Sequence, residues 1–206
     1  MWIGIDITHL AITLIRSRLT DTFAGAAKYE VIGEPVSLPD AAELAHADPY
    51  QFQWWALGLV GARPVEEKKG ADKGIDGRIY FHVGDKKTRQ IILSVKAGHV
   101  NVSHVRDLRG VLDREKAEIG VLLSLEEPTG PMRKEAATAG FYTSPWGKHA
   151  RLQLMTIDYL LTGKTLDRPP IQTNTTFKKA PKAATKGPER KRLDFDADEQ
   201  DEDQPF

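Results

Sequence analysis

The residues Ile119-Gly-Val-Leu-Leu-Ser124 form a short run that contains no charged side chain and does not alternate between apolar and polar positions. Such a run is typical of a strand in the middle of a sheet, where other elements cover both faces. Helices are the elements that usually provide this cover on the two faces of a sheet. The run therefore predicts an α/β domain built around this strand.

The segments on both sides of this run alternate between strand-like and helix-like patterns. Further strands are expected over residues 77–83, 90–96 and 152–156, and helices over residues 49–61, 102–118, 131–139 and 157–163. We predict one α/β domain over residues 49–163, with a mixed sheet flanked by helices.

Residues 1–36 precede this domain and have a pattern of their own. Ile3–Ile7 predicts a short strand, Thr8 can cap a helix that follows it, and a second extended piece comes next. Residues 37–48 are polar and rich in alanine, which predicts a linker or a connecting helix.

Residues 164–206 carry two blocks of opposite charge within a chain whose formal net charge is +0. Lys178–Arg192 is basic apart from Glu189, and Asp194–Asp203 is acidic. With several prolines and few large apolar residues, this segment cannot bury a core, and we expect a disordered tail. It serves either to keep the chain in solution or as a basic arm that contacts DNA phosphates.

The composition excludes several classes of protein. The 206 residues contain no cysteine, which excludes disulfides, thiolate nucleophiles and cysteine zinc sites. The longest nearly uncharged apolar run, 54–62, is about half of the roughly 20 residues that a membrane helix needs. The chain begins without the basic segment of a secretory signal. We expect a cytoplasmic protein without a membrane partner.

The residues that could take part in catalysis lie at the ends of two expected strands. Asp76 stands where the first strand of a hairpin begins, and Lys96 stands where the second strand ends. Because strand side chains alternate, Ser94 and Lys96 point to one face, and all three side chains can converge at one sheet edge. Asp76 and the carbonyl of Val95 would offer oxygen ligands to Mg²⁺, whose water could attack a phosphodiester while Lys96 stabilises the growing charge. Gly74 and Gly77 would let the backbone approach DNA closely.

This order of elements resembles the Mrr-type restriction endonucleases of the PD-(D/E)xK nuclease superfamily. The resemblance covers residues 49–163 and includes Val105-Arg-Asp-Leu-Arg-Gly-Val111, the strand at 119–124 and Ala136–Phe141. It implies a restriction-endonuclease-like fold, Mg²⁺ or Mn²⁺ as cofactor, and double-stranded DNA as partner, with a homodimer left open. By this resemblance Asp76 takes the place of the metal-binding aspartate and Lys96 that of the catalytic lysine.

The chain departs from the family pattern at the second carboxylate. The superfamily usually has Glu, and the Mrr branch often Gln, where this chain has Ser94, and some relatives carry a glutamate on the first helix, where it offers Gln51 and Gln53. Asp72 could replace the missing carboxylate or could be a loop residue in solvent. The catalytic candidates are Asp76, Ser94, Lys96 and Gln53; the metal candidates are Asp76, Val95 and Asp72; the DNA contacts are Lys73, Arg78 and Lys148.

Trp2–Ile7, followed by a helix with Arg16 and Leu19, is similar to the C-terminal edge of amino-methylating DNA methyltransferases (adenine-N6 or cytosine-N4). By this resemblance Asp6 would hold the ribose of S-adenosylmethionine. The glycine-rich loop and the Asp-Pro-Pro-Tyr motif of those enzymes are absent, so the cofactor is expected only in a longer parent polypeptide. Residues 1–36 would then be a remnant of a fused methyltransferase.

The leading hypothesis is a Mg²⁺-dependent DNA endonuclease domain, a hydrolase of a restriction–modification system. Ser94 favours an alternative, a non-cleaving DNA-binding or specificity module of a site-specific DNA methyltransferase. A third hypothesis is a methyltransferase fragment whose nuclease-like domain only supports assembly.

Overall fold

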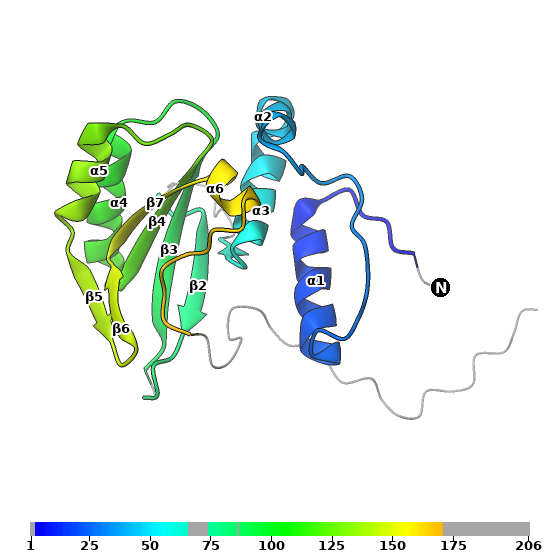
Figure 1. Cartoon of the computed structure of the whole chain (residues 1–206), viewed down its shortest axis with the longest axis horizontal. Coiled ribbons are helices and arrows are strands. Elements are labelled where there is room, and N and C mark those ends of the chain that lie inside the picture. The colour runs from blue at the N-terminus through cyan, green and yellow to red at the C-terminus, as the bar shows by residue number, and fades with distance from the viewer. Residues whose placement is uncertain (1–2, 66–73, 86, 171–206) are drawn as a thin grey trace, which may run out of the picture.

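The computed structural model describes residues 3–65, 74–85 and 87–170, with β4 (Ile119–Ser124) as an interior strand of its sheet (Figure 1). Every residue of β4 is buried. The sheet has the order β1-β2-β3-β4-β7, and its other strands are β1 (Arg63–Pro64), β2 (Gly77–Phe81), β3 (Arg89–Lys96) and β7 (Leu152–Thr156). Strands β1 to β3 pair antiparallel, whereas β3, β4 and β7 pair parallel. The predicted fold class, a mixed sheet in an α/β domain, is confirmed.

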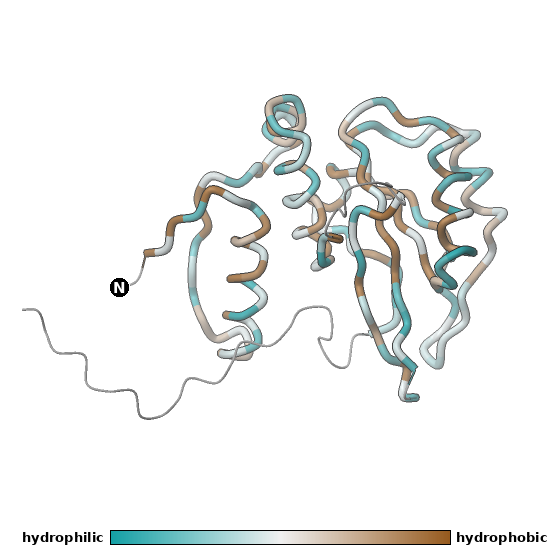
Figure 2. The backbone as a smooth tube through the Cα atoms, turned by 180° about the vertical axis from the view of Figure 1, so that it is seen from behind, coloured by the Kyte–Doolittle hydropathy of each residue, from teal (hydrophilic) through white to brown (hydrophobic). Residues whose placement is uncertain are grey.

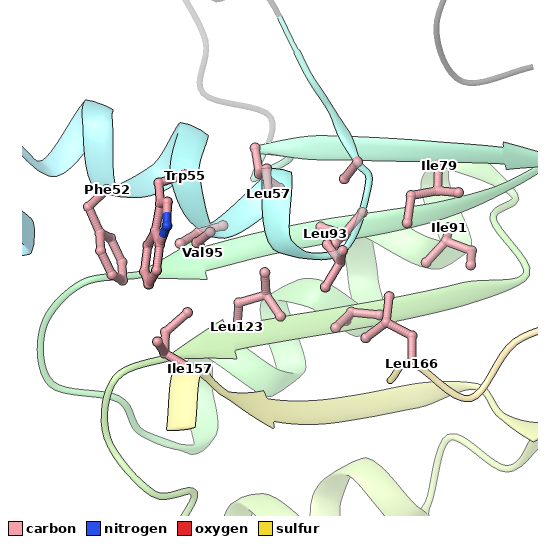
Figure 3. Packing of buried hydrophobic residues seen from close by; sticks show 14 of the residues in the cluster. Phe52, Trp55, Leu57, Ile79, Ile91, Leu93, Val95, Leu123, Ile157 and Leu166 are labelled. Carbon is pink, nitrogen blue, oxygen red and sulfur yellow. The ribbon is translucent and has the colours of Figure 1, made fainter. Parts of the chain in front are cut away.

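Helices cover the two faces of the sheet. On one face lie α2 (Leu38–Ala47), α3 (Pro49–Leu59) and α6 (Ile157–Leu161), and on the other lie α4 (Val102–Glu115) and α5 (Gly130–Ala137) (Figure 1). The residues of β3 alternate between the two layers. Leu93 and Val95 pack under α3 (Figure 3). Ile92 packs under α4 on the other face. This alternation produces two separate hydrophobic clusters, one on each face.

Two glycines let the helices approach the sheet closely. A Cβ atom on Gly77 would lie 2.5 Å from Leu57 Cδ2 of α3, and one on Gly120 would lie 2.9 Å from Leu112 Cδ1 of α4. Both distances are too short for a side chain, so each leucine fills the space that a Cβ would need. Gly77 is buried, and the expectation that it lets the backbone approach DNA is wrong, because α3 covers it.

The N-terminal segment packs on the outer side of α3. Helix α1 (His9–Phe23) begins after Thr8, as predicted, and lies beside α3 (Figure 1). The side chain of Gln51 joins the two, because its Oε1 accepts from the N–H of His9 at 3.0 Å and its Nε2 donates to the carbonyl of Ile7 at 3.2 Å. The N-terminal segment is therefore anchored at the start of α1.

The expected strand over Ile3–Ile7 is wrong. The segment alternates in hydropathy, but it forms no strand in the described part of the chain, and Ile5 is 93% exposed (Figure 2). A strand needs a hydrogen-bonded neighbour. The sheet lies on the other side of α3, so it offers no edge to this segment.

Of the two alternatives predicted for residues 37–48, a linker or a connecting helix, the structure has the helix: the segment contains α2, whose Ala41 is fully buried against the same cluster as α3. The sequence prediction lacked a hairpin of β5 (Phe141–Ser144) and β6 (Gly147–Ala150), which precedes β7. The chain after α6 packs back on the fold as far as residue 170, with Leu166 buried. No helix of the described residues is long and apolar enough to cross a membrane.

We predict that Gly120→Ala lowers the free energy of unfolding by about 1–3 kcal/mol, because the new methyl group overpacks the contact with Leu112. Urea denaturation of purified protein measures the change. Gly110→Ala is the matched control: Gly110 lies in α4, is exposed and has no atom within 4 Å of an added Cβ. That variant should gain about 0.5–1 kcal/mol. Equal effects of the two substitutions would contradict the packing argument.

Candidate functional site

Backbone hydrogen bonds to both neighbouring strands fix the position of Asp76. Its N–H donates to the carbonyl of Leu93 at 2.9 Å, and its carbonyl accepts from the N–H of Val65 at 3.1 Å. These bonds continue the ladders on both sides of β2 by one residue. Asp76 therefore has the orientation of a strand residue, although it precedes β2.

The carboxylate of Asp76 is bound by β3. Its Oδ2 accepts from the backbone N–H of Val95 at 2.6 Å and from the hydroxyl of Ser94 at 3.2 Å. Ser94 is buried, with 5% of its surface exposed. Bonds to an ionised carboxylate are shorter and stronger than neutral ones, and the short distance to Val95 fits this pattern. The protein itself thus uses one oxygen of the Asp76 carboxylate.

Lys96 is the last residue of β3 and is half-buried. The register pairs Gly77 with Leu93, and its continuation places Asp76 opposite Ser94. Lys96 is then diagonal to Asp76 on the same face, at a Cβ separation of about 7 Å in a typical ladder. The structure therefore brings Asp76, Ser94 and Lys96 together at one edge of the sheet.

Gly74 lies in the turn that precedes Asp76. Its φ of +68° lies in the left-handed region, and a Cβ atom there would lie 3.2 Å from Val111 Cγ2 of α4. Both the backbone angle and the contact favour glycine at this position. Gly74 therefore holds the loop against α4 just before Asp76.

Two of the other predicted residues lie near this edge but have different surroundings. Gln53 is half-buried on α3, which covers the opposite face of the sheet from Ser94. Arg78 lies two residues beyond Asp76, and its Nη2 donates to Glu115 Oε2 at 2.8 Å. This bond lowers the pKa of Glu115, so the pair stays charged well into the acid range.

The remaining predicted residues lie elsewhere. Lys148 is exposed on β6, in the hairpin that precedes β7. The first residue of β7, Leu152, pairs with Gly120 near the start of β4. Lys96 pairs with Ser124, at the other end of β4, so Lys148 and Lys96 lie at opposite ends of the sheet. Asp72 and Lys73 fall outside the described residues.

Asp6 has a local structural role. Its Oδ1 accepts from both the N–H and the hydroxyl of Thr8 at 2.8 Å, and Thr8 in turn caps α1. The bond from the Thr8 hydroxyl is the main cause that lowers the pKa of Asp6. The carboxylate therefore takes part in the start of α1, and its proposed contact with a ribose stays a prediction.

The sequence reasoning missed a pair of ionisable residues at the same end of the sheet. His99 follows β3 and Glu126 follows β4, and His99 Nδ1 lies 3.0 Å from Glu126 Oε2. The sequence indicates that the loops after these two strands lie at the same edge, because parallel neighbouring strands end there, but it does not indicate that these two side chains meet. This pair gives the edge a second carboxylate next to the strand that carries Lys96.

The donors among the described residues do not fit a metal site with two carboxylates. Within the described ranges, no group of three or more histidine, cysteine, aspartate and glutamate residues could hold a metal ion. Mg²⁺ binds to oxygen ligands, one or two of them carboxylates, in near-ideal octahedral geometry. Ser94, where the resemblance of the sequence would lead us to expect a second carboxylate, donates its hydroxyl to Asp76 Oδ2.

Residues 50–162 match a family model described as NACHT-associated inactive Restriction Endonuclease 1. The chain belongs to this family. This match confirms that residues 49–163 form a restriction-endonuclease-like domain, whereas the resemblance to the Mrr-type branch stays a prediction. The description of the family, NA-iREase1, as inactive agrees with the incomplete donor set among the described residues. The methyltransferase-like segment 1–36 lies outside the matched range and stays a prediction.

Two solved structures of restriction endonucleases are similar to this NA-iREase1 chain. MspJI in complex with a 27-mer oligonucleotide has 15% sequence identity and a TM-score of 0.44, and the match covers 66% of this chain and 33% of that one. FokI bound to DNA has 14% identity and a TM-score of 0.42, with 70% and 28% covered. The chain thus spans about a third of the length of these structures. No curated protein matches it.

We predict that Asp76 stabilises the fold without a metal. Asp76→Ala should lower the free energy of unfolding by about 1–3 kcal/mol, because the buried N–H of Val95 loses its acceptor, and Ser94→Ala should cost about 1 kcal/mol. Denaturation in EDTA and in Mg²⁺ measures both. If Mg²⁺ stabilises the parent protein but not Asp76→Ala, the carboxylate binds metal instead.

Proposed function

We propose that this restriction-endonuclease-like domain binds double-stranded DNA without cleaving it. The observation that carries the proposal is the hydrogen bond from Ser94 Oγ to Asp76 Oδ2 at the position where the superfamily holds its metal with a second carboxylate. A hydroxyl is a poor ligand beside a carboxylate, and here it serves as a donor. The description of the family as inactive supports the same conclusion.

The support for DNA binding comes from the fold and from Lys96. The matched family is described as one of inactive restriction endonucleases, and by the resemblance of the sequence Lys96, the last residue of β3, takes the place of the catalytic lysine. Within residues 3–65, 74–85 and 87–170, the ammonium group of Lys96 has no ion-pair partner. A lysine with this freedom can neutralise a phosphate at the edge of the sheet.

Supercoiled plasmid incubated with Mg²⁺, Mn²⁺ or EDTA, together with a duplex-binding assay, tests the proposal. We expect the parent protein to bind duplex DNA and to leave the plasmid intact in each condition. Ser94→Glu should introduce the missing carboxylate and produce metal-dependent nicking. Absence of duplex binding would refute the proposal.

The alternative, a Mg²⁺-dependent endonuclease, is favoured by one observation, the convergence of Asp76 and Lys96 at one edge. It requires that the parent protein nick plasmid and that Asp76→Ala abolish nicking. Since a single carboxylate binds metal weakly, Mn²⁺ should then work better than Mg²⁺. If Asp76→Ala nicks as fast as the parent, the activity does not belong to this site.

Lys96→Ala provides a prediction on DNA binding alone. The variant should bind duplex DNA less tightly, and the slope of log K against log salt should fall by about 0.9 because one phosphate contact is lost. Lys87→Ala is the matched control, since Lys87 is exposed at the turn between β2 and β3, at the other end of the sheet. Equal slopes for Lys96→Ala and the parent would exclude a phosphate contact at Lys96.

The charged tail, residues 171–206, lies outside the described residues, and its role rests on the sequence. If Lys178–Arg192 contacts phosphates, deletion of the tail should weaken DNA binding and flatten its salt dependence by about 0.9 in slope for each lost contact. An unchanged slope would mean that the acidic block neutralises the basic one.

Two further roles stay proposals. The methyltransferase-like segment would bind S-adenosylmethionine through Asp6 only within a longer polypeptide, and the domain would then serve as its specificity module in a restriction–modification system.

A homodimer would present two copies of the site to duplex DNA. Light scattering of the complete chain with and without duplex measures the second point.

A further inference from the structure

A second group of polar side chains lies at the end of the sheet opposite Asp76. It consists of Ser144 at the end of β5, His149 in β6 and Asp167 in the segment after α6. We propose that these residues form a serine, histidine and aspartate relay that activates Ser144 as a nucleophile toward small activated esters and related acyl or phosphonyl donors. The proposal does not depend on DNA binding.

The distances have the order that such a relay requires. Ser144 Oγ lies 3.0 Å from His149 Nε2, and His149 Nδ1 lies 2.7 Å from Asp167 Oδ1. A nucleophile within hydrogen-bond reach of a base, which is itself oriented by a third group, is the recurring arrangement of nucleophilic catalysis.

The chemistry of the partners determines the direction of the bond between His149 and Asp167. An ionised carboxylate only accepts hydrogen bonds, so His149 donates to Asp167 through Nδ1–H. In the neutral imidazole the lone pair is then at Nε2, and it shares the single proton of the Ser144 hydroxyl with the carbonyl of Gly147, which lies 3.2 Å from Oγ. This is the tautomer that can take a proton from the serine.

The backbone of Asp167 is held by Gln153, whereas its side chain is 54% exposed. Gln153, which is buried, donates from Nε2 to the carbonyl of Asp167 at 2.6 Å and accepts at Oε1 from its N–H at 3.0 Å. The second carboxylate oxygen of Asp167 accepts from the N–H of Ala150 at 3.1 Å. Supporting residues of this kind are typical of a preorganised site.

The imidazole and the serine have the exposure that their roles need. His149 is 8% exposed, and its ring stacks on Tyr142 with centroids 6.4 Å apart. Ser144 is half-buried at the hairpin turn, where the N–H of Trp146 donates to its Oγ at 3.2 Å. This donor favours the deprotonated oxygen. The indole of Trp146, 42% exposed, offers an apolar surface beside it.

The proposed step balances with the groups present. Oγ of Ser144 forms a bond to the acyl carbon or phosphorus, and its proton moves to Nε2 of His149. The leaving group departs with the bonding electron pair and takes that proton. For an ester, water then attacks the acyl-serine with His149 as base, which releases the acid and restores the hydroxyl.

The test uses the complete chain and a fluorophosphonate probe, which forms a stable bond to serine and releases fluoride. Peptide mass spectrometry locates the adduct, and the rate of labelling is measured for each variant. We expect an adduct on Ser144 in the parent protein and none there in Ser144→Ala. Ser103 is the internal control, because it is exposed on α4 and its backbone N–H is bound by Asn101.

The role of Asp167, which positions His149, is tested with a variant that keeps the shape of the site. Asp167→Asn is isosteric but no longer forces the Nδ1–H tautomer, so labelling of Ser144 should fall by roughly 100-fold or more. His149→Gln should have the same effect, and thermal unfolding shows whether each variant is folded. Labelling of Ser144 at the rate of Ser103, or labelling of folded Asp167→Asn at the rate of the parent, would overturn the proposal.

Discussion

In the ladder between β2 and β3, Gly77 lies opposite Leu93, and much of the molecule depends on that register. It points the bare face of Gly77 at Leu57, which lets α3 lie directly on the sheet. It also places the carboxylate of Asp76 against the N–H of Val95. A shift by one residue would reverse the two faces, so the packing of α3 and the site would be lost together.

The same register explains why the site resembles a nuclease centre in shape but differs in chemistry. The strand ends bring an aspartate and a lysine to one edge, which is the arrangement that the resemblance of the sequence to restriction endonucleases implies. The serine between them turns one carboxylate oxygen toward the protein. A carboxylate that completes the hydrogen bonding of its own sheet stabilises the fold, and this role persists without a metal.

The two ends of the sheet carry different chemistry. Asp76, Lys96 and the pair of His99 with Glu126 lie where β3 and β4 end, whereas the group around His149 lies where β4 begins. The hairpin of β5 and β6 connects α5 to β7 at that second end and carries Ser144 and His149 on neighbouring strands. One buried sheet thus presents two separate groups of polar side chains, one at each end of its strands.

The sequence by itself determined the layers of the domain and the convergence of Asp76, Ser94 and Lys96. Strand side chains alternate with a period of two, and apolar runs mark buried strands, so local patterns suffice for both. Only the tertiary structure decided the rest. It decided that residues 3–7 form no strand and that Gly77 is buried. It also decided that His99 contacts Glu126 and that His149 contacts Asp167. Those contacts join residues 27 and 18 positions apart through loops, and loop paths depend on packing that no local pattern encodes.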